Sequence, residues 1–216
     1  ALPLVHGKSV FEVLFERPDV TQSFNDGMSN ISRLTGPVIL QSYDFSAIGK
    51  IVDVGAGHGQ LLSAILKKYP SLQGVVYDLP DLMPGAEENI RKQGLTGRLE
   101  AVGGDMFQSV PGGADAYFMQ HIIHDWADEE ARTILQNCRK ALNSHPEGRL
   151  LLAESVIREG NSPDAAKFID LEMLIMCGGR ERTESEYREL LASAGFHLDR
   201  IVPTGVGIDV IEARCV

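Results

Sequence analysis

Short apolar runs alternate with longer amphipathic segments from Lys50 to the end of the chain. The runs are rich in β-branched residues, and the amphipathic segments repeat apolar positions at helical spacing. This alternation is typical of parallel β-strands joined by crossover helices, so we predict an α/β fold with a doubly wound sheet. The predicted strands are Lys50–Val54, Gly74–Tyr77, Leu99–Val102, Ala114–Met119, Arg149–Glu154, His197–Pro203 and Gly207–Ala213.

The first 48 residues have a different pattern, with helical spacing over residues 9–15 and 20–34. We therefore expect one domain, in which a helical lead-in (1–48) precedes an α/β core (49–216). Two later helices carry end signals. One follows Asp128, which we expect to cap it, and the other starts at Thr183 with Glu186 completing a capping box.

Composition and charge bear on which kinds of molecule the chain can bind. The chain has 216 residues, and its 20 Lys and Arg against 30 Asp and Glu give a net charge of −10, which disfavours nucleic acid and anionic membranes. The three cysteines form no Cys-x-x-Cys pair, and no apolar run is long enough to span a membrane. Residues 1–5 lack the basic start of a signal peptide, so we expect a cytoplasmic protein.

A glycine-rich turn follows the first predicted strand. Gly55-Ala-Gly57-His-Gly59 leads into a helix whose N-terminus offers free N–H donors. A dinucleotide fingerprint needs a small residue where this chain has Gln60, so the spacing favours a nucleoside cofactor without a pyrophosphate. Asp78 and Asp105 follow the next two strands and can hold ribose and adenine. Each feature alone has a plainer interpretation, as loop geometry or a helix cap.

Five segments in this order carry a family resemblance: Ile51-Val-Asp-Val-Gly-Ala-Gly-His-Gly59, Val76-Tyr-Asp-Leu-Pro80, Gly103-Gly-Asp-Met-Phe107, His121-Ile-Ile-His-Asp-Trp126 and Gly178-Gly-Arg-Glu-Arg-Thr183. Together they resemble the S-adenosylmethionine-dependent O-methyltransferases of the caffeic-acid, hydroxyindole and bacterial polyketide type, over most of residues 20–216. The resemblance implies a Rossmann-like class I methyltransferase fold, with a mostly parallel seven-stranded sheet and an antiparallel last strand. It also implies S-adenosylmethionine as cofactor and no metal.

The resemblance assigns cofactor contacts by position. Gly55 and Gly57 line the methionine part of the cofactor, Asp78 holds the ribose, and Asp105 and Met106 contact the adenine. The implied cofactor-binding positions are Ser32, Gly55, Gly57, Asp78, Asp105, Met106 and Gln120. Gln120 departs from the lysine that plant members have at that position, so we expect a neutral contact or none.

The resemblance also implies that His124 is the catalytic base, flanked by Glu154 and Glu181. A phenol has a pKa of about 10, and an imidazole can take its proton as the methyl group moves. A carboxylate on the second imidazole nitrogen fixes the tautomer. His124 follows the predicted strand Ala114–Met119, and Glu154 ends the next strand. We expect Glu181 to act from the opposite side of the imidazole. The implied substrate-binding positions are Met28, Trp126 and Met173.

Members of this family carry an N-terminal winged-helix region that dimerises, and we expect residues 1–216 to lack it, which leaves a homodimer open. The expected partner is a small hydroxyl acceptor. His121 and His124 are spaced like metal ligands, but no further His or Cys follows at ligand spacing, so we expect no zinc site.

Other functions remain open from sequence. Relatives methylate nitrogen or carbon, or use the cofactor without methyl transfer. A nicotinamide-dependent oxidoreductase and a non-catalytic binding module are further alternatives. A nucleic-acid methyltransferase fits least, because of the charge and the lack of an Asn/Asp-Pro-Pro-aromatic motif.

Overall fold

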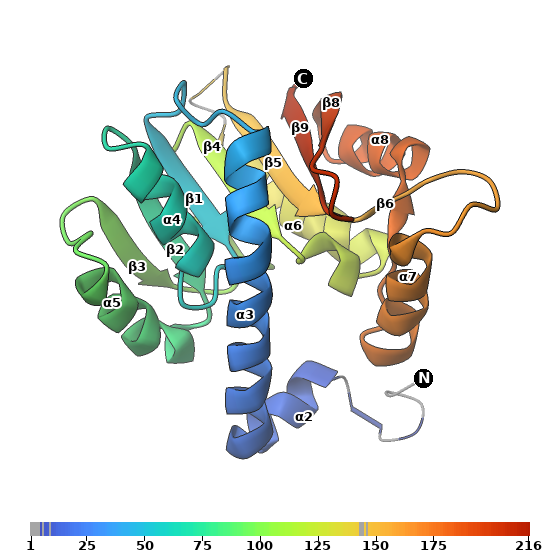
Figure 1. Cartoon of the computed structure of the whole chain (residues 1–216), viewed down its shortest axis with the longest axis horizontal. Coiled ribbons are helices and arrows are strands. Elements are labelled where there is room, and N and C mark those ends of the chain that lie inside the picture. Colours follow the sequence, from blue (N-terminus) through green and yellow to red (C-terminus); the bar gives the residue numbers. More distant parts are fainter. Residues whose placement is uncertain (1–4, 6, 9, 143–144, 146) are drawn as a thin grey trace.

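Seven strands form one sheet in the order β3-β2-β1-β4-β5-β9-β8 (Figure 1). The computed structural model describes residues 5, 7–8, 10–142, 145 and 147–216. Strands β1 to β5 are parallel, and β9 is antiparallel to both its neighbours, which confirms the predicted fold. The strands are β1 (Lys50–Val54), β2 (Gln73–Asp78), β3 (Leu99–Gly103), β4 (Ala116–Gln120), β5 (Arg149–Glu154), β8 (Phe196–Pro203) and β9 (Asp209–Cys215).

Helices cover both faces of the sheet (Figure 1). They are α2 (Val10–Glu16), α3 (Pro18–Ser42), α4 (Gln60–Lys68), α5 (Met83–Lys92), α6 (Asp128–Ala141), α7 (Ala165–Met176) and α8 (Glu184–Ser193), with short 3₁₀ turns η1 (Pro80–Leu82) and η2 (Ile123–Asp125). Helices α2 and α3 lie where the sequence predicted helical segments, although residue 9 of the first segment lies outside the described residues. A small second sheet of β6 (Val156–Ile157) and β7 (Arg182–Thr183) was not predicted.

Two apolar cores lie on opposite faces of the sheet. Successive strand residues point to opposite faces, so Val75 joins the core under α6 and α8, whereas Val76 joins the core under α3, α4 and α5. Both faces are buried, which explains why the strands are almost continuously apolar. The chain order reverses between β1 and β4, and ligands of such sheets bind beyond the carboxyl ends of the strands at that reversal.

The predicted helix ends are only partly correct. Thr183 and Glu186 form the expected capping box at the start of α8. In α6, Ala127 occupies the N-cap position and Asp128 is the first helical residue, so the predicted Asp128 cap is wrong. The Asp128 carboxylate binds Arg182 instead, at 2.8 Å from Nη2.

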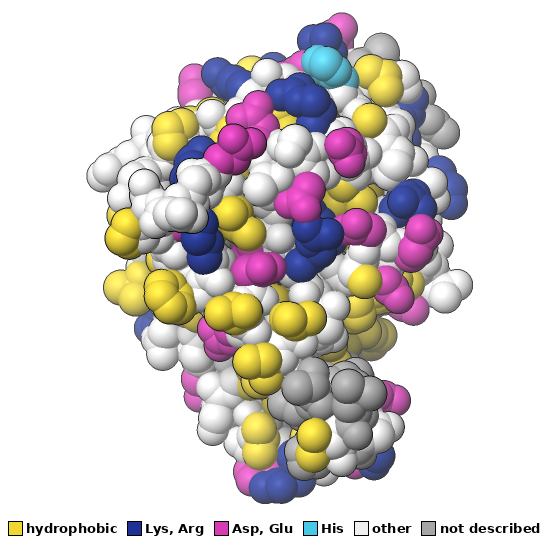
Figure 2. All heavy atoms as spheres, turned by 90° about the vertical axis from the view of Figure 1, so that its right-hand side faces the viewer, with side chains coloured by type: hydrophobic (Ala, Val, Ile, Leu, Met, Phe, Trp, Pro, Cys, Tyr) yellow, Lys and Arg dark blue, Asp and Glu magenta, His cyan; other side chains and the backbone are white. Residues whose placement is uncertain are grey.

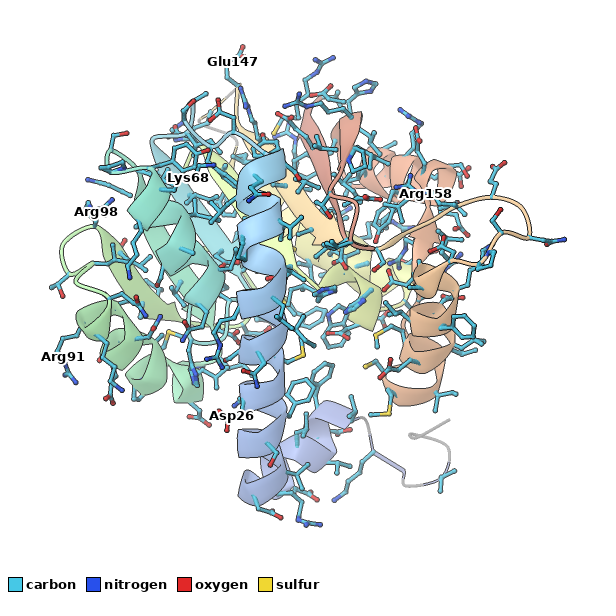
Figure 3. All side chains as sticks on the ribbon, viewed as in Figure 1. Asp26, Lys68, Arg91, Arg98, Glu147 and Arg158 are labelled. Carbon is cyan, nitrogen blue, oxygen red and sulfur yellow. The ribbon has the colours of Figure 1, made fainter. Side chains whose placement is uncertain are left out.

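Arg98 holds the turn between α4 and β2, on the opposite side of the molecule from strands β8 and β9 (Figure 3). Its Nη1 donates to the carbonyl oxygens of Leu66, Tyr69, Pro70 and Leu72. This arginine therefore stabilises local loop geometry through backbone contacts alone.

Helix α7 carries an exposed apolar face. Phe168 is 74% exposed, and Leu171, Leu174 and Ile175 are each more than half exposed. Figure 2 views the molecule from the side where α7 lies and shows hydrophobic side chains gathered on it. In the described part of the chain, no helix has the length and apolar character needed to cross a membrane.

Candidate active site

The turn after β1 has the geometry that its glycines predicted. Gly55, Gly57 and Gly59 have φ of 73°, 56° and 70°, a region that favours glycine. A Cβ on Gly55 would lie 2.3 Å from Ile122 Cδ1, whereas a Cβ on Gly57 would meet nothing within 4 Å. The backbone at Gly57 therefore faces open space at the N-terminal end of α4, as a cradle for a ligand requires.

Asp78 closes one side of this cradle. Its Oδ2 accepts the N–H of Gly57 at 2.7 Å, and its Oδ1 accepts the N–H of Leu79 at 2.7 Å. Burial raises the pKa of the Asp78 carboxyl, and the two backbone donors oppose that rise. Each oxygen keeps a lone pair for another donor, which suits a pair of ribose hydroxyls.

The segment after β3 forms a turn beside the indole of Trp126. Asp105 is exposed, and its Oδ1 accepts the N–H of Phe107 at 2.8 Å. Asn137 donates to the carbonyl of Met106 at 2.9 Å, a support that sequence reasoning missed. The ring centroids of Phe107 and Trp126 are 4.7 Å apart. Trp126, expected on the substrate side, therefore packs next to the segment expected to meet the adenine.

Ser32 and Gln120 come together from distant parts of the sequence. Ser32 Oγ on α3 donates to Gln120 Oε1 at 3.2 Å, and Gln120 Nε2 donates to Thr35 Oγ1 at 2.7 Å. Thr35 was not predicted, although it lies one helical turn after Ser32. Met28 on α3 and Met173 on α7 are partly buried, and both helices project beyond the carboxyl ends of the strands (Figure 1).

His124 lies in η2 with two buried carboxylates facing one of its nitrogens. Nδ1 is 2.7 Å from Glu181 Oε1 and 3.9 Å from Glu154 Oε2. The prediction that the two acids act from opposite sides is therefore wrong, because β5 and the β7 segment reach the same side of the ring. Nε2 lies 3.7 Å from Asp125 Oδ1, beyond hydrogen-bonding distance.

Glu154 is anchored by the backbone that carries His124. Its Oε1 accepts the N–H groups of Ile122 and Ile123 at 3.0 and 2.8 Å. Among the described residues, Oε2 of both Glu154 and Glu181 lacks a hydrogen-bond partner. Burial raises the pKa of Glu154 to about 7, although the neighbouring His124 opposes the rise.

The electrostatics favour a strong base. Burial alone lowers the pKa of His124, but the charge of Glu154 and the hydrogen bond to Glu181 outweigh it and raise that pKa to about 9. In the neutral ring, Nδ1–H donates to Glu181 Oε1, and this bond selects the tautomer in which Nε2 is the basic nitrogen.

His121 lies beside His124, and the centroids of the two rings are 5.1 Å apart. The backbone of His121 has a left-handed φ of 53°. Burial lowers the pKa of His121 to about 3, so its ring is neutral. One potential ligand atom each of His121, His124 and Glu154 lies within 4.8 Å of the others. The spacing argument missed this carboxylate because it searched for His and Cys alone. His124 Nδ1 is already hydrogen-bonded to Glu181 Oε1. That the site holds no metal stays a prediction.

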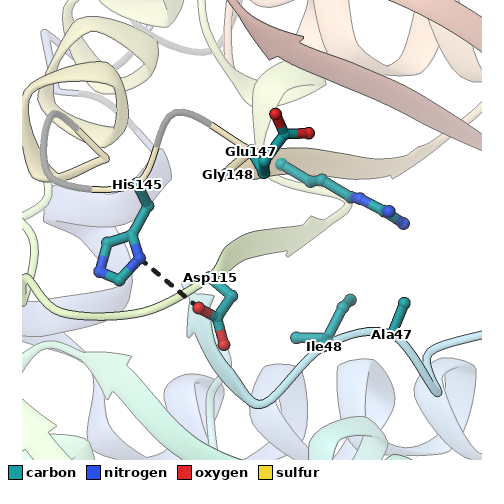
Figure 4. A pocket seen from close by; sticks show the side chains of 7 residues that line it. Ala47, Ile48, Asp115, His145, Glu147 and Gly148 are labelled. Carbon is teal, nitrogen blue, oxygen red and sulfur yellow. Dashed lines mark ion pairs between the residues drawn. The ribbon is translucent and has the colours of Figure 1, made fainter.

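A hollow lies at the opposite end of the strands from the glycine turn. Its lining includes Asp115 and His145, which form an ion pair at 3.5 Å (Figure 4). Asp115 Oδ2 also accepts the N–H groups of Gly49 and Lys50 at 3.0 and 2.8 Å. This carboxylate therefore holds a turn together and lies far from the glycine turn.

A model of the O-methyltransferase domain matches residues 2–197. The chain belongs to this O-methyltransferase family. It is 38% identical over 208 residues to the phenazine O-methyltransferase PhzM of Lysobacter antibioticus, covering 96% of this chain and 60% of that protein. It is also 35% identical over 216 residues to the 8-amino-8-demethylriboflavin N,N-dimethyltransferase of Streptomyces davaonensis, covering 99% and 62%.

The fold agrees with solved structures of the family. The O-methyltransferase NcsB1 of neocarzinostatin biosynthesis, solved with S-adenosylmethionine and 2-hydroxy-5-methyl naphthoic acid, superposes with a TM-score of 0.89 at 35% identity, over 99% of this chain and 63% of that one. The chain spans between 50% and 62% of the length of these curated relatives.

Proposed function

We propose that this chain transfers a methyl group from S-adenosylmethionine to a hydroxyl, phenolic in kind, of a small aromatic metabolite. The observation that carries the proposal is the buried His124, held on one side by Glu181 and Glu154. This group follows β4, the strand beside the glycine turn of β1. A nucleoside cradle and a base near it are what methyl transfer to oxygen needs.

The residues of the glycine turn fit the cofactor. Gly57 faces open space, and Asp78 keeps lone pairs for ribose hydroxyls. Asp105 and Met106 are assigned to the adenine, with Ser32 and Gln120 on the α3 side. When bound, S-adenosylmethionine supplies an electrophilic methyl group on its sulfonium.

His124 acts on the acceptor. In the neutral form of the ring, which becomes more populated as the pH rises toward 9, Nε2 takes the hydroxyl proton. Its pKa of about 9 is close to the pKa of about 10 of a phenol, so proton transfer costs little. Glu181 holds Nδ1 and stabilises the imidazolium as it forms, while Glu154 adds a second negative charge. Most of the remaining acceleration comes from holding acceptor and methyl donor aligned.

An aromatic acceptor fits the substrate role that we assign to Met28 and Met173, because methionine side chains pack well on flat rings. Two of the named relatives are a phenazine methyltransferase and a demethylriboflavin methyltransferase, and NcsB1 was solved with a naphthoic acid; all three compounds have flat ring systems. One of them is an N,N-dimethyltransferase, so methylation of an aromatic amine is the second candidate. A homodimer and a cytoplasmic location stay expectations.

The test is His124→Ala, with His145→Ala at the opposite end of the strands as the matched control. Methyl transfer from labelled S-adenosylmethionine is measured on 1,4-dihydroxy-2-naphthoic acid, caffeic acid and their amino analogues. We expect a loss of about 10²–10⁴-fold in His124→Ala only, with S-adenosylhomocysteine binding unchanged by calorimetry. Unchanged turnover would remove the base from the account, and transfer to the amines alone would establish the second candidate.

A further inference from the structure

Arg182 is a fully buried arginine directly after Glu181. Its Nε and Nη2 donate to Asp128 Oδ1 at 3.0 and 2.8 Å. Its Nη1 donates to the carbonyl oxygen of Ile123 at 3.1 Å, and Nη2 to that of Trp126 at 3.0 Å. Nη1 also reaches the carbonyl of Arg180 at 3.3 Å.

These acceptors enclose the turn that carries His124. Ile123 precedes His124 and Trp126 follows two residues after it, so one guanidinium holds both ends of η2. The Ile123 carbonyl also accepts the N–H of Trp126 at 3.3 Å, whereas the Trp126 carbonyl lies just beyond the turn, and buried carbonyls need a donor. Because the guanidinium is planar and rigid, the position of each carbonyl fixes the position of the other.

The preceding residues tie the same two segments together. The N–H of Arg180 donates to the carbonyl oxygen of His124 at 2.8 Å. Gly179 approaches the turn so closely that a Cβ there would lie 2.0 Å from that oxygen. Glu181 therefore lies between two residues that both bind the backbone around His124.

We propose that Arg182 is a positioning residue: through its bonds to Ile123, Trp126 and Asp128, it holds the His124 turn at hydrogen-bonding distance from Glu181. The effect on methyl transfer rests on the proposed function, whereas the effect on the position of the His124 turn does not. Without the guanidinium, the turn is attached to the Glu181 segment mainly through the Arg180 N–H. His124 then samples orientations in which Nε2 no longer faces the acceptor.

The test compares Arg182→Lys, Asp128→Asn and the control Arg98→Lys. Lysine keeps the charge but has a compact ammonium that cannot span the two carbonyls. Arg98 also binds backbone carbonyls, at a turn remote from His124, so Arg98→Lys reports what losing such a clamp does in general (Figure 3). Each protein is examined by hydrogen–deuterium exchange and, with the phenolic acceptors above, for kcat and KM.

We expect Arg182→Lys to speed exchange in residues 121–127 by at least about tenfold, with the strands of the core still protected. We expect kcat to fall by about 10–100-fold, with KM within about twofold, because the base is misplaced while binding surfaces remain. Asp128→Asn keeps both carbonyl bonds and should show smaller changes in the same direction. It also serves as the test variant if Arg182→Lys does not fold.

The exchange measurement needs no acceptor, so it decides the geometric claim even if the proposed function fails. Exchange in residues 121–127 equal to that of Arg98→Lys would overturn the proposal. So would a uniform rise in exchange over the whole chain, which is the signature of a purely structural role. Faster local exchange with unchanged kcat would overturn the catalytic part.

Discussion

Replacing Glu181 by glutamine removes the charge next to His124 while keeping the shape of the side chain. The carboxylate is 1% exposed, and its Oε1 is 2.7 Å from His124 Nδ1. The pKa of His124 stands at about 9 against an ordinary 6.5, a difference of about 3 kcal/mol in favour of the charged ring. Glu154 and Glu181 both contribute, and a close carboxylate commonly shifts a pKa by about 1–3 units.

We therefore expect Glu181→Gln to lower the pKa of His124 by about 1–2 units. The assay is a pH titration followed by NMR of ¹³Cε1-labelled histidine, with the His124 signal assigned from His124→Ala. Glu186→Gln is the matched control, because Glu186 is a nearby carboxylate at the start of α8 that binds Thr183 and Arg180 and not His124. A His124 pKa that is unchanged in Glu181→Gln, or that falls equally in the control, would refute the electrostatic reasoning.

Four further outcomes follow from the site. The methylation rate should rise with pH as His124 loses its proton, up to about pH 9, and a flat profile from pH 6 to 9 would contradict this. Burial holds His121 neutral and lowers its pKa to about 3, so the folded state loses stability as the pH falls below about 6.5, where the unfolded chain binds the proton. His121→Asn should therefore recover about 2 kcal/mol of unfolding free energy at pH 5. Urea titrations at pH 5 and pH 8 measure this difference. Gly55→Ala should lower the melting temperature because its Cβ meets Ile122, whereas Gly57→Ala should chiefly weaken S-adenosylhomocysteine binding; equal melting losses would argue against the cradle. Dialysis against EDTA should leave the rate unchanged, and loss restored by zinc would establish a metal site.

Most of the sheet could be predicted because each strand is short, apolar and followed by a turn signal. The β1–Gly55 turn is the clearest case, since its glycines are spaced for one backbone geometry. Helix α7 could not be found in the same way, because its exposed positions are as apolar as its packed ones. Two-residue strands such as β6 carry no periodic signal at all.

The site was predictable in its members but not in its geometry. Asp78 and His124 follow strands whose carboxyl ends lie at the same edge of the sheet. The sheet topology therefore predicts that the two residues lie on the same side of the molecule. The side of the ring that Glu181 reaches depends on the close approach of Gly179 to the His124 carbonyl, which spacing does not encode. Apart from the Arg180 carbonyl, the partners of Arg182 come from residues 123–128, more than fifty positions away in the sequence.

The most direct measurement is a calorimetric titration of the protein with S-adenosylhomocysteine, run beside NAD at the same concentration. The account predicts micromolar binding of S-adenosylhomocysteine and none of NAD, with affinity lost in Gly57→Ala. Binding of NAD alone, or of neither compound while circular dichroism shows an intact fold, would contradict the assignment of the glycine turn to S-adenosylmethionine.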